Sequence, residues 1–306
     1  MGQKKFPFIN KLGCGNYQQS SIILIFVGIT KQMENVKYRT GLVLSGGGAR
    51  GFAHLGVLKA LNDAGIFPEV IAGTSAGALV GALYADGHSP ESILQMMNAS
   101  SSLHYVRPTV PREGLLQISG IEKILRDHLR AKDFEDLKIP LYVTATDLNN
   151  GKAVYFSSGE LIQPVIASAS IPVLFKPVII GNIHYVDGGV MDNMPLKPID
   201  GLCELKIGSF VNPIGYEETV TSLVQIAERT FMLNLAREVE SSRSRFDIFI
   251  APEELKRYKI LDPEKAVEVF EIGYKATREQ LDEPSVKEIL TQKNKTSGRD
   301  SSTRVS

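Results

Sequence analysis

The chain has 306 residues and a mass of 33.5 kDa, with 43% apolar and 22% charged residues. This composition is typical of globular proteins and excludes disorder of the whole chain. The 34 basic and 34 acidic residues cancel to a formal charge of zero, so no global positive field would hold nucleic acid, and any membrane contact would be local and largely apolar. Cys14 and Cys203 lie far apart and form no disulfide framework.

The first 38 residues are interpreted as an extension in front of the folded domain. Their longest apolar run, residues 22–27, is far shorter than the roughly 20 residues that cross a bilayer. Lysines precede this run as in an export signal, but residues 30–33 do not resemble a cleavage site. Two hypotheses stay open: the segment is a non-native start upstream of Met33, or it directs export.

Residues 39–283 are predicted to form one α/β domain, because short apolar runs bounded by glycine alternate with helical patterns. The expected strands are residues 42–44, 70–72, 141–145, 153–156, 178–180, 183–186, 207–211 and 248–250. The expected helices are residues 52–61, 78–84, 220–240 and 263–281. Residues 284–306 are rich in polar side chains and are expected to be a solvated tail.

A glycine-rich loop, Gly46-Gly47-Gly48-Ala49-Arg50-Gly51, follows the first expected strand and precedes a helix. Its glycines allow consecutive backbone N–H groups to converge on one negative atom, and the helix adds its positive dipole end. Such a loop binds either a phosphate or the oxyanion of an acyl-transfer intermediate. A tight turn that needs glycine only for steric reasons explains the pattern equally well.

Ser75 lies in Gly73-Thr74-Ser75-Ala76-Gly77, between a buried strand and an apolar helix. This is the strand, sharp turn and helix context that a nucleophile elbow requires. Gly73 and Gly77 are free of side chains that would collide as the turn tightens, and the following helix N-terminus favours the negative charge of an alkoxide. The pattern predicts a catalytic serine, and the alternative is a helix cap of small residues.

The base for Ser75 is less certain, because five histidines are available: His54, His88, His104, His128 and His184. His54 alone precedes the serine, as in the chymotrypsin order, but it falls inside the helix after the glycine loop. The order Ser, Asp, His would allow a triad of Ser75, Asp147 and His184. The alternation around His184 favours an ordinary strand residue over a catalytic base.

Asp187 offers a second solution, because Asp187-Gly188-Gly189 follows directly on an expected strand. A carboxylate in front of two glycines can sit on a tight turn beside a cleft, and α/β folds keep their sites at strand ends. In a pair with Ser75 it would accept the hydroxyl proton directly and later activate water. The competing interpretation is a plain Asp-Gly turn.

These motifs together resemble the patatin-like phospholipase family. Its glycine-rich loop, its Gly-x-Ser-x-Gly, its Ala-Ser-x-x-x-Pro block at residues 167–172 and its Asp-Gly-Gly appear in order, and the resemblance extends from about residue 39 to 283. It implies a three-layer α/β/α fold with a mostly parallel sheet. It also implies a Ser75–Asp187 dyad that hydrolyses lipid acyl esters without metal or cofactor, with Gly46, Gly47, Gly48 and Arg50 shaping the oxyanion site.

The expected activity is that of a phospholipase A or lysophospholipase acting through an acyl-enzyme. The alternatives are a phosphate- or nucleotide-binding module using the glycine loop, which lacks a P-loop ending, and a noncatalytic scaffold. The partner would be a lipid or phospholipid ester, with transient membrane or micelle contact and no nucleic acid. We expect a cytoplasmic protein, secreted or periplasmic if residues 1–32 act as a signal.

Candidate residues for the substrate side are less specific. Apolar side chains that could line an acyl trough are equally compatible with the core. Residues 104–114 form an irregular segment in which Arg107 and Arg112 could meet a phosphate head group, or simply remain solvated. The candidate trough residues are Leu115, Leu116, Ile118, Ile171, Val173, Leu174 and Phe175.

Overall fold

A computed structural model describes residues 36–101, 118–216, 220–260 and 263–300. Tyr38–Ser306 forms one compact unit, separate from Met1–Lys37. Its strands are β1 (Tyr38–Leu44), β2 (Val70–Thr74), β3 (Leu141–Asp147), β4 (Lys152–Phe156), β5 (Val178–Ile180), β6 (Ile183–Asp187), β7 (Cys203–Ser209) and β8 (Ile248–Ile250). Its α-helices are α2 (Phe52–Asp63), α3 (Ala76–Ala85), α4 (Pro90–Ser101), α5 (Ser119–His128), α6 (Ile162–Ser168), α7 (Leu223–Ser242), α8 (Ala266–Asp282) and α9 (Pro284–Asp300).

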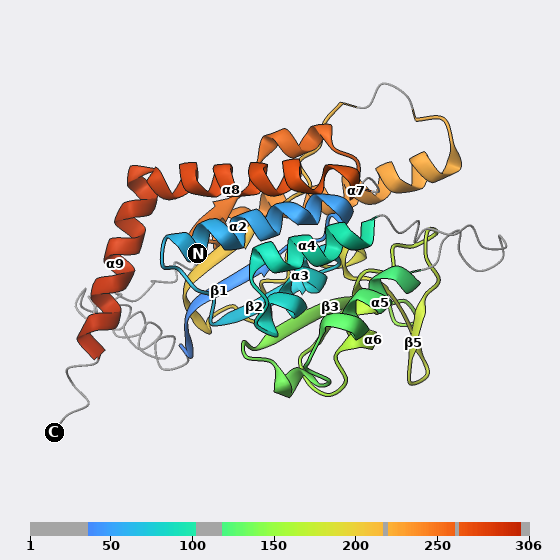
Figure 1. Ribbon diagram of the computed structural model, residues 1–306, viewed down its shortest axis with the longest axis horizontal. Coiled ribbons are helices and arrows are strands. Elements are labelled where there is room, and N and C mark those ends of the chain that lie inside the picture. The colour runs from blue at the N-terminus through green and yellow to red at the C-terminus, as the bar shows by residue number, and fades with distance from the viewer. Residues whose placement is uncertain (1–35, 102–117, 217–219, 261–262, 301–306) are drawn as a thin grey trace, which may run out of the picture. The chain divides into compact units, whose positions relative to one another are not determined.

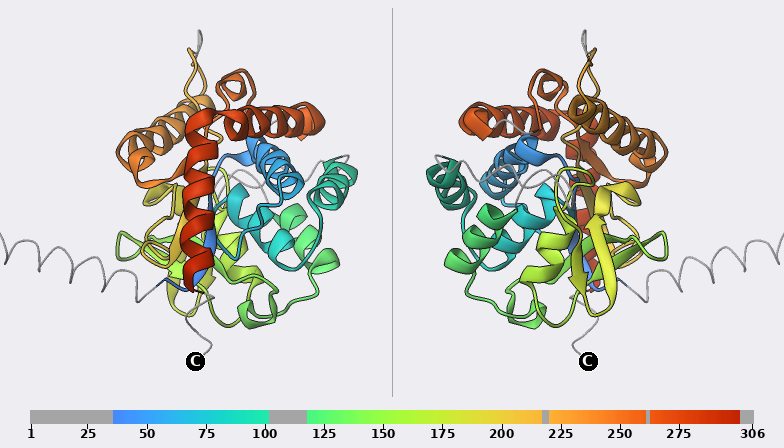
Figure 2. Two further views of the ribbon diagram at one scale, coloured as in Figure 1. Left: turned by 90° about the vertical axis from the view of Figure 1, so that its left-hand side faces the viewer. Right: turned by 90° about the vertical axis from the view of Figure 1, so that its right-hand side faces the viewer.

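The eight strands form a single sheet in the order β5-β6-β3-β2-β1-β7-β8, with β4 paired to β3. Strands β3, β2, β1, β7 and β8 are parallel, whereas β4, β5 and β6 pair in antiparallel fashion. The α/β class and the mostly parallel sheet are thereby confirmed. Figures 1 and 2 show α8 lying beside α2 and α9 turning steeply away from α8.

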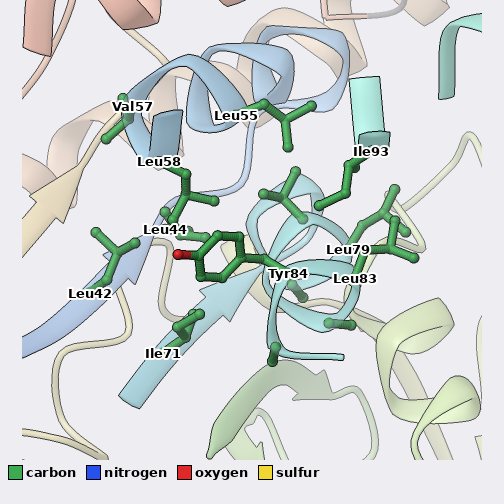
Figure 3. Packing of buried hydrophobic residues seen from close by; sticks show 14 of the residues in the cluster. Leu42, Leu44, Leu55, Val57, Leu58, Ile71, Leu79, Leu83, Tyr84 and Ile93 are labelled. Carbon is green, nitrogen blue, oxygen red and sulfur yellow. The ribbon is translucent and has the colours of Figure 1, made fainter. Parts of the chain in front are cut away.

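The sheet is buried on both faces, which explains why its central strands are continuous apolar runs. Leu42 and Leu44 of β1 point to one face, where they pack with residues of α2 and α3 such as Leu58 and Leu83. Figure 3 shows these side chains meeting between the two helices and the strands. Val43 points to the opposite face, which the segment of residues 194–203 and the end of α7 cover. The result is the three-layer α/β/α arrangement.

One edge of β3 is shared by two strands that run toward each other. Antiparallel β4 pairs with Val143 through Asp147 along one edge. Both β2 and β6 pair with β3 residues that β4 also pairs with, so β2 and β6 lie on the edge of β3 opposite β4. Parallel β2 extends along it to the pair Thr74–Thr144, and antiparallel β6 comes back to the pair Asp187–Ala145. The carboxyl ends of β2 and β6 therefore meet head-on, at the level where Ser75 begins its turn.

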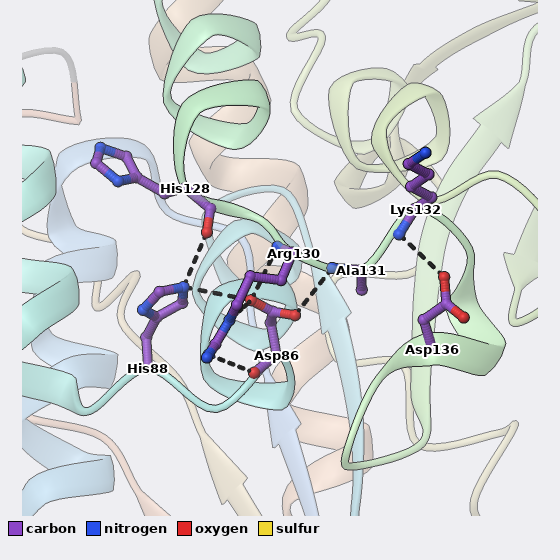
Figure 4. A network of polar contacts seen from close by, with 7 residues as sticks. All are labelled: Asp86, His88, His128, Arg130, Ala131, Lys132 and Asp136. Carbon is purple, nitrogen blue, oxygen red and sulfur yellow. Dashed lines mark hydrogen bonds and ion pairs between the residues drawn. The ribbon is translucent and has the colours of Figure 1, made fainter.

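The far end of α3 is fixed by a buried carboxylate. Asp86, which is 4% exposed, accepts hydrogen bonds from the backbone N–H groups of Arg130 and Ala131 and from the Arg130 side chain. The His88 ring lies 3.3 Å from the same carboxylate. Figure 4 shows this network joining the turn after α3 to the segment after α5. It holds α3 against its neighbours at the end opposite Ser75.

The C-terminal stretch differs from the solvated tail expected from sequence, because residues 284–300 are helical. Val286 of α9 is 3% exposed, and Ile289 and Leu290 pack against the same core. These three positions share one helix face, which offsets the polar composition. The expectations for Cys14, for residues 1–35 and for residues 301–306 lie outside the described residues. Among the residues that are described, none of the helices is long and apolar enough to cross a membrane.

Candidate active site

Ser75 occupies a strained turn between β2 and α3. Its backbone has φ 53° and ψ −120°, a combination that side chains rarely adopt, and it is the N-cap of α3. Its amide donates a 2.8 Å hydrogen bond to the Ser168 hydroxyl, which in turn donates to the Thr144 carbonyl. These contacts hold the turn to β3. The positive end of α3 lies beneath Ser75.

The turn is tight because glycines stand on both sides of Ser75. A Cβ at Gly77 would collide with the carbonyl oxygens of Leu44 and Ser45, and one at Gly73 would collide with the Gly77 backbone. Helix α3 can therefore approach the end of β1 only if residue 77 lacks a side chain. The two glycines of the motif are explained by close backbone packing.

Asp187 lies opposite Ser75 and is completely buried. Its Oδ1 accepts a 2.8 Å hydrogen bond from the Gly189 amide, whereas Oδ2 has no aligned donor among the described residues. Burial raises the pKa of Asp187 to about 7, while the nearby Ser75 hydroxyl and the Gly189 amide oppose the rise. The Asp187 carboxyl group thus combines a pKa near neutrality with a position beside the Ser75 hydroxyl.

The glycine loop reaches the same place from the end of β1. Most of its amides are occupied: that of Gly46 donates to Asn193 Oδ1, and that of Ala49 donates to the Ile260 carbonyl. Within the described chain, the amides of Gly47 and Gly48 have no acceptor. Gly48 has φ +54°, and a Cβ there would collide with the Ile260 carbonyl. Two neighbouring N–H groups are therefore unused beside Ser75 and Asp187.

His54 contacts the residue before the glycine loop and does not face Ser75. It is fully buried on α2, where its Nε2 donates to the Ser45 carbonyl and its Nδ1 accepts from the Ser209 hydroxyl. Burial lowers the pKa of His54 to about 4, so the ring is neutral. A neutral ring donates one hydrogen bond and accepts the other, which matches its two partners.

Arg50 contributes in a different way from the glycines before it. Its guanidinium donates to the carbonyl oxygens of Tyr258 and Pro213 and is 8% exposed. It lines the cavity next to the Ser75 pocket and not the pocket itself. The side chain therefore ties two distant segments to the glycine loop.

Ser75, Asp187 and the three glycines line one pocket, whose outer wall is apolar. The wall consists of Ile171, Ile260 and three side chains of α7, and the space between them is too narrow for a water molecule. Met232 and Leu235 of α7 are 5% and 1% exposed. The α7 residues in the wall are Phe231, Met232 and Leu235.

The histidine alternatives are not brought to this pocket. His184 is exposed on β6 and contacts Asn149, and Asp147 accepts hydrogen bonds from Asn150. Of the trough candidates, Ile171 lines the pocket, Leu174 is in the core and Val173 is 60% exposed. The expectations for Arg107, Arg112, Leu115 and Leu116 lie outside the described residues.

Sequence reasoning missed three polar side chains that shape the site. Ser168 anchors the Ser75 turn, Asn193 accepts from Gly46, and Asn212 donates to the Gly46 carbonyl. Ser168 belongs to the Ala-Ser-x-x-x-Pro block, so a signal for it was present without a role. Asn193 and Asn212 are single residues in loops and carry no local pattern. Within the described residues, no cluster of three or more metal-ligating side chains exists.

A three-layer α/β/α fold with a serine on a strained strand-to-helix turn, a buried carboxylate and a glycine loop defines the class of protein. The family model described as patatin-like phospholipase matches residues 42–200, more than half of the chain. The chain belongs to the patatin-like phospholipase family.

Individual relatives are more distant. An uncharacterized NTE family protein of Mycobacterium tuberculosis is 36% identical over 166 residues, which are 54% of this chain and 46% of that protein. Lysophospholipase nte1 of Aspergillus terreus is 28% identical over 281 residues, covering 79% of this chain and 18% of that protein. The chain thus spans less than half the length of these relatives. The crystal structure of VipD from Legionella pneumophila has a TM-score of 0.46 and 18% identity, covering 80% of this chain and 67% of that one.

Proposed function

We propose that this protein is a serine hydrolase of lipid acyl esters, of the phospholipase A or lysophospholipase type. The observation that carries the proposal is the meeting of β2 and β6 on one edge of β3, which brings Ser75 and Asp187 into one pocket with Gly46–Gly48. Family membership and the lysophospholipase name of a relative point to the same substrate class. The apolar pocket wall suits an acyl chain.

In the proposed mechanism, Asp187 accepts the proton of the Ser75 hydroxyl as the oxygen attacks the ester carbonyl carbon. The carbonyl oxygen becomes an oxyanion that accepts hydrogen bonds from the free Gly47 and Gly48 amides. The intermediate collapses, the ester bond breaks, and Asp187 returns its proton to the leaving alcohol. Water then attacks the acyl-enzyme while Asp187 takes its proton. The bond between the acyl carbon and Ser75 Oγ breaks, Asp187 returns the proton to Oγ, and the fatty acid is released.

The substrate would be met at a lipid surface. Exposed apolar side chains lie on α7 and on the segment before it, which we call the apolar ridge: Tyr216, Val220, Leu223 and Ile226. Leu223 is 83% exposed, and α7 also supplies the pocket wall. An amphipathic helix with such a face binds the interface of a membrane or micelle. Transient peripheral contact would thus place the pocket beside its substrate.

The test combines active-site labelling with lipid hydrolysis. A fluorophosphonate should modify the wild type at Ser75, and Ser75→Ala should abolish both labelling and fatty acid release. Asp187→Asn should reduce both by several orders of magnitude, since the proton acceptor is lost. His184→Ala and Asp147→Asn serve as controls and should retain labelling. Loss of activity in His184→Ala with a fully active Asp187→Asn would replace the dyad with a triad. Nucleotide protection against unfolding, without any labelling, would replace the hydrolase with a binding module.

A further inference from the structure

A second cavity, of about 260 Å³, lies beside the Ser75 pocket and carries an unusual charge. We call it the cationic cavity, because five of its described lining residues are basic and one, Glu228, is acidic. The basic side chains come from three parts of the chain: the glycine loop, α7 and residues 256–259. The basic residues are Arg50, Arg229, Lys256, Arg257 and Lys259.

The two cavities share a wall. Met232 and Ile260 line both of them, so the cationic cavity adjoins the Ser75 pocket at these side chains. Arg50 fixes the arrangement by binding the Tyr258 and Pro213 carbonyls, one in each flanking segment. The backbone of Ile260 is held as well, because its carbonyl accepts from the Ala49 amide of the glycine loop. The cationic cavity is thus tied directly to the loop proposed to hold the oxyanion.

The basic side chains differ in how far they are already committed. Arg229 donates to the Gly215 carbonyl, and Lys256 lies 3.8 Å from Glu253. By contrast, Arg257 and Lys259 have no carboxylate within ion-pair distance anywhere in the described part of the chain. Both are exposed at the cavity. Their charge is available to an anionic ligand.

We propose that the cationic cavity binds the phosphate of a phospholipid head group while the acyl ester lies at Ser75, which makes phosphate-bearing lipids the preferred esters. The inference rests on the proposed function. In a glycerophospholipid only the glycerol carbons separate the ester from the phosphate, which fits two adjoining cavities that share Met232 and Ile260 as lining residues. Arg and Lys bind phosphate through charge-assisted hydrogen bonds. The arginines that the sequence suggests for this role, Arg107 and Arg112, are outside the described residues.

Binding is tested first without turnover, in the Ser75→Ala background, by calorimetry with a short-chain lysophospholipid below its critical micelle concentration. Adding Arg257→Gln and Lys259→Gln should weaken binding about tenfold, because two charge-assisted contacts are lost. A matched variant with the same charge change, Lys123→Gln with Lys275→Gln on exposed faces of α5 and α8, should bind as Ser75→Ala does. Equal affinities in all three proteins would overturn the proposal even if Ser75 hydrolyses lipids.

Turnover gives the second measurement. In the protein with an intact Ser75, the ratio of kcat/KM for the lysophospholipid to kcat/KM for a monoacylglycerol of the same chain should fall about tenfold in the Arg257→Gln, Lys259→Gln variant. The loss should appear mainly in KM, and the control variant should keep the wild-type ratio. A wild type that cleaves neither ester contradicts the proposed function, whereas cleavage of both with an unchanged ratio contradicts only the head-group site.

Inorganic phosphate distinguishes the source of the ligand. At constant ionic strength, inorganic phosphate should inhibit monoacylglycerol hydrolysis by the wild type no more than it inhibits the Arg257→Gln, Lys259→Gln variant. The reason is that a head group binds in the cationic cavity only when its acyl chain is anchored at the Ser75 pocket. Inhibition of the wild type that the Arg257→Gln, Lys259→Gln variant escapes, with an unchanged substrate ratio, would make the cavity a site for free phosphate and overturn the head-group assignment.

Discussion

Asp187 is the residue at which function and stability oppose each other. A buried carboxylate is costly when ionised, and its raised pKa of about 7 expresses that cost. The proposed chemistry nevertheless needs the ionised form, so hydrolysis should increase as the pH rises through about 7. The Gly189 amide compensates one oxygen, and Oδ2 is left for the Ser75 proton.

The effect on stability has a definite sign. Since the folded-state pKa is raised above the usual value near 3.8, the folded protein binds the proton more tightly, and the free energy of unfolding falls as the pH rises from about 4 to about 7. Asp187→Asn removes this cost and should stabilise the protein at pH 8 by about 4 kcal/mol. At pH 4 the difference should nearly vanish. Urea unfolding of both proteins at the two pH values measures it.

A control with the opposite sign is available in Asp147. The hydrogen bond from the Asn150 side chain lowers the pKa of Asp147. Asp147→Asn should therefore lower the free energy of unfolding at pH 8, and the difference from the wild type should be smaller near pH 3. If Asp187→Asn also destabilised the protein at pH 8, the carboxylate would not carry the electrostatic cost that burial assigns to it.

At the scale of the element, α7 decides whether anything reaches Ser75. Three of its side chains close a pocket too narrow for a water molecule, so an ester requires these side chains to rotate or α7 to shift. Leu235 packs against the position where Gly189 would carry a Cβ, which brings the helix close to the Asp-Gly-Gly turn.

Phe231→Ala should increase the rate at which a fluorophosphonate labels Ser75 severalfold, because it removes bulk from the partly buried edge of the pocket wall. The labelling rate is measured at a pH well above 7, where Asp187 is ionised in every variant, so that differences in rate report access to Ser75 and not proton transfer. Leu233→Ala, on the exposed side of the same helix and 48% exposed, removes bulk without touching the wall and should label at the wild-type rate. Equal acceleration by both variants would point to general loosening of α7.

The elements themselves follow from local sequence, but their meetings do not. Glycine-bounded apolar runs correctly indicated β1, β2 and β3, because buried parallel strands have a continuous apolar signature. The Ser75 turn and the Asp187 turn were each visible in a few consecutive residues. Their approach depends on the register of β3, and Asn193 contacts Gly46 although 147 residues separate them in the chain. No local pattern encodes such contacts. Nor did the polar sequence of α9 disclose its buried Val286.

For the whole molecule, the formal net charge is zero, so electrostatic attraction of a ligand depends on local groups of charged residues. The basic residues of the cationic cavity and the apolar ridge lie together, because Tyr216 and Val220 also line that cavity. Apolar area provides the binding energy at a lipid surface, and nearby cations add attraction to phosphates. The proposed lipid contact therefore draws on apolar and basic side chains that lie together, although the chain as a whole is neutral.

Leu223→Ser with Ile226→Ser should reduce the fraction of protein that sediments with phosphatidylcholine vesicles severalfold, since apolar burial at the lipid surface is lost at both positions. The matched control replaces two exposed apolar residues elsewhere, Ile179→Ser and Val267→Ser, which are 59% and 52% exposed. Circular dichroism verifies that all variants fold. Vesicle binding that falls equally in both variants would reject the ridge as the contact surface.

The shared edge of β3 also has a kinetic meaning. The Ser75 and Asp187 turns meet only when β2 and β6 have both paired with β3, each across a long intervening stretch of chain. Pairing of segments so far apart is slow because loop closure precedes the reward. Recovery of esterase turnover during refolding should therefore lag behind the return of the helical circular dichroism signal. The rate at which turnover returns would then report the last pairing step of the sheet.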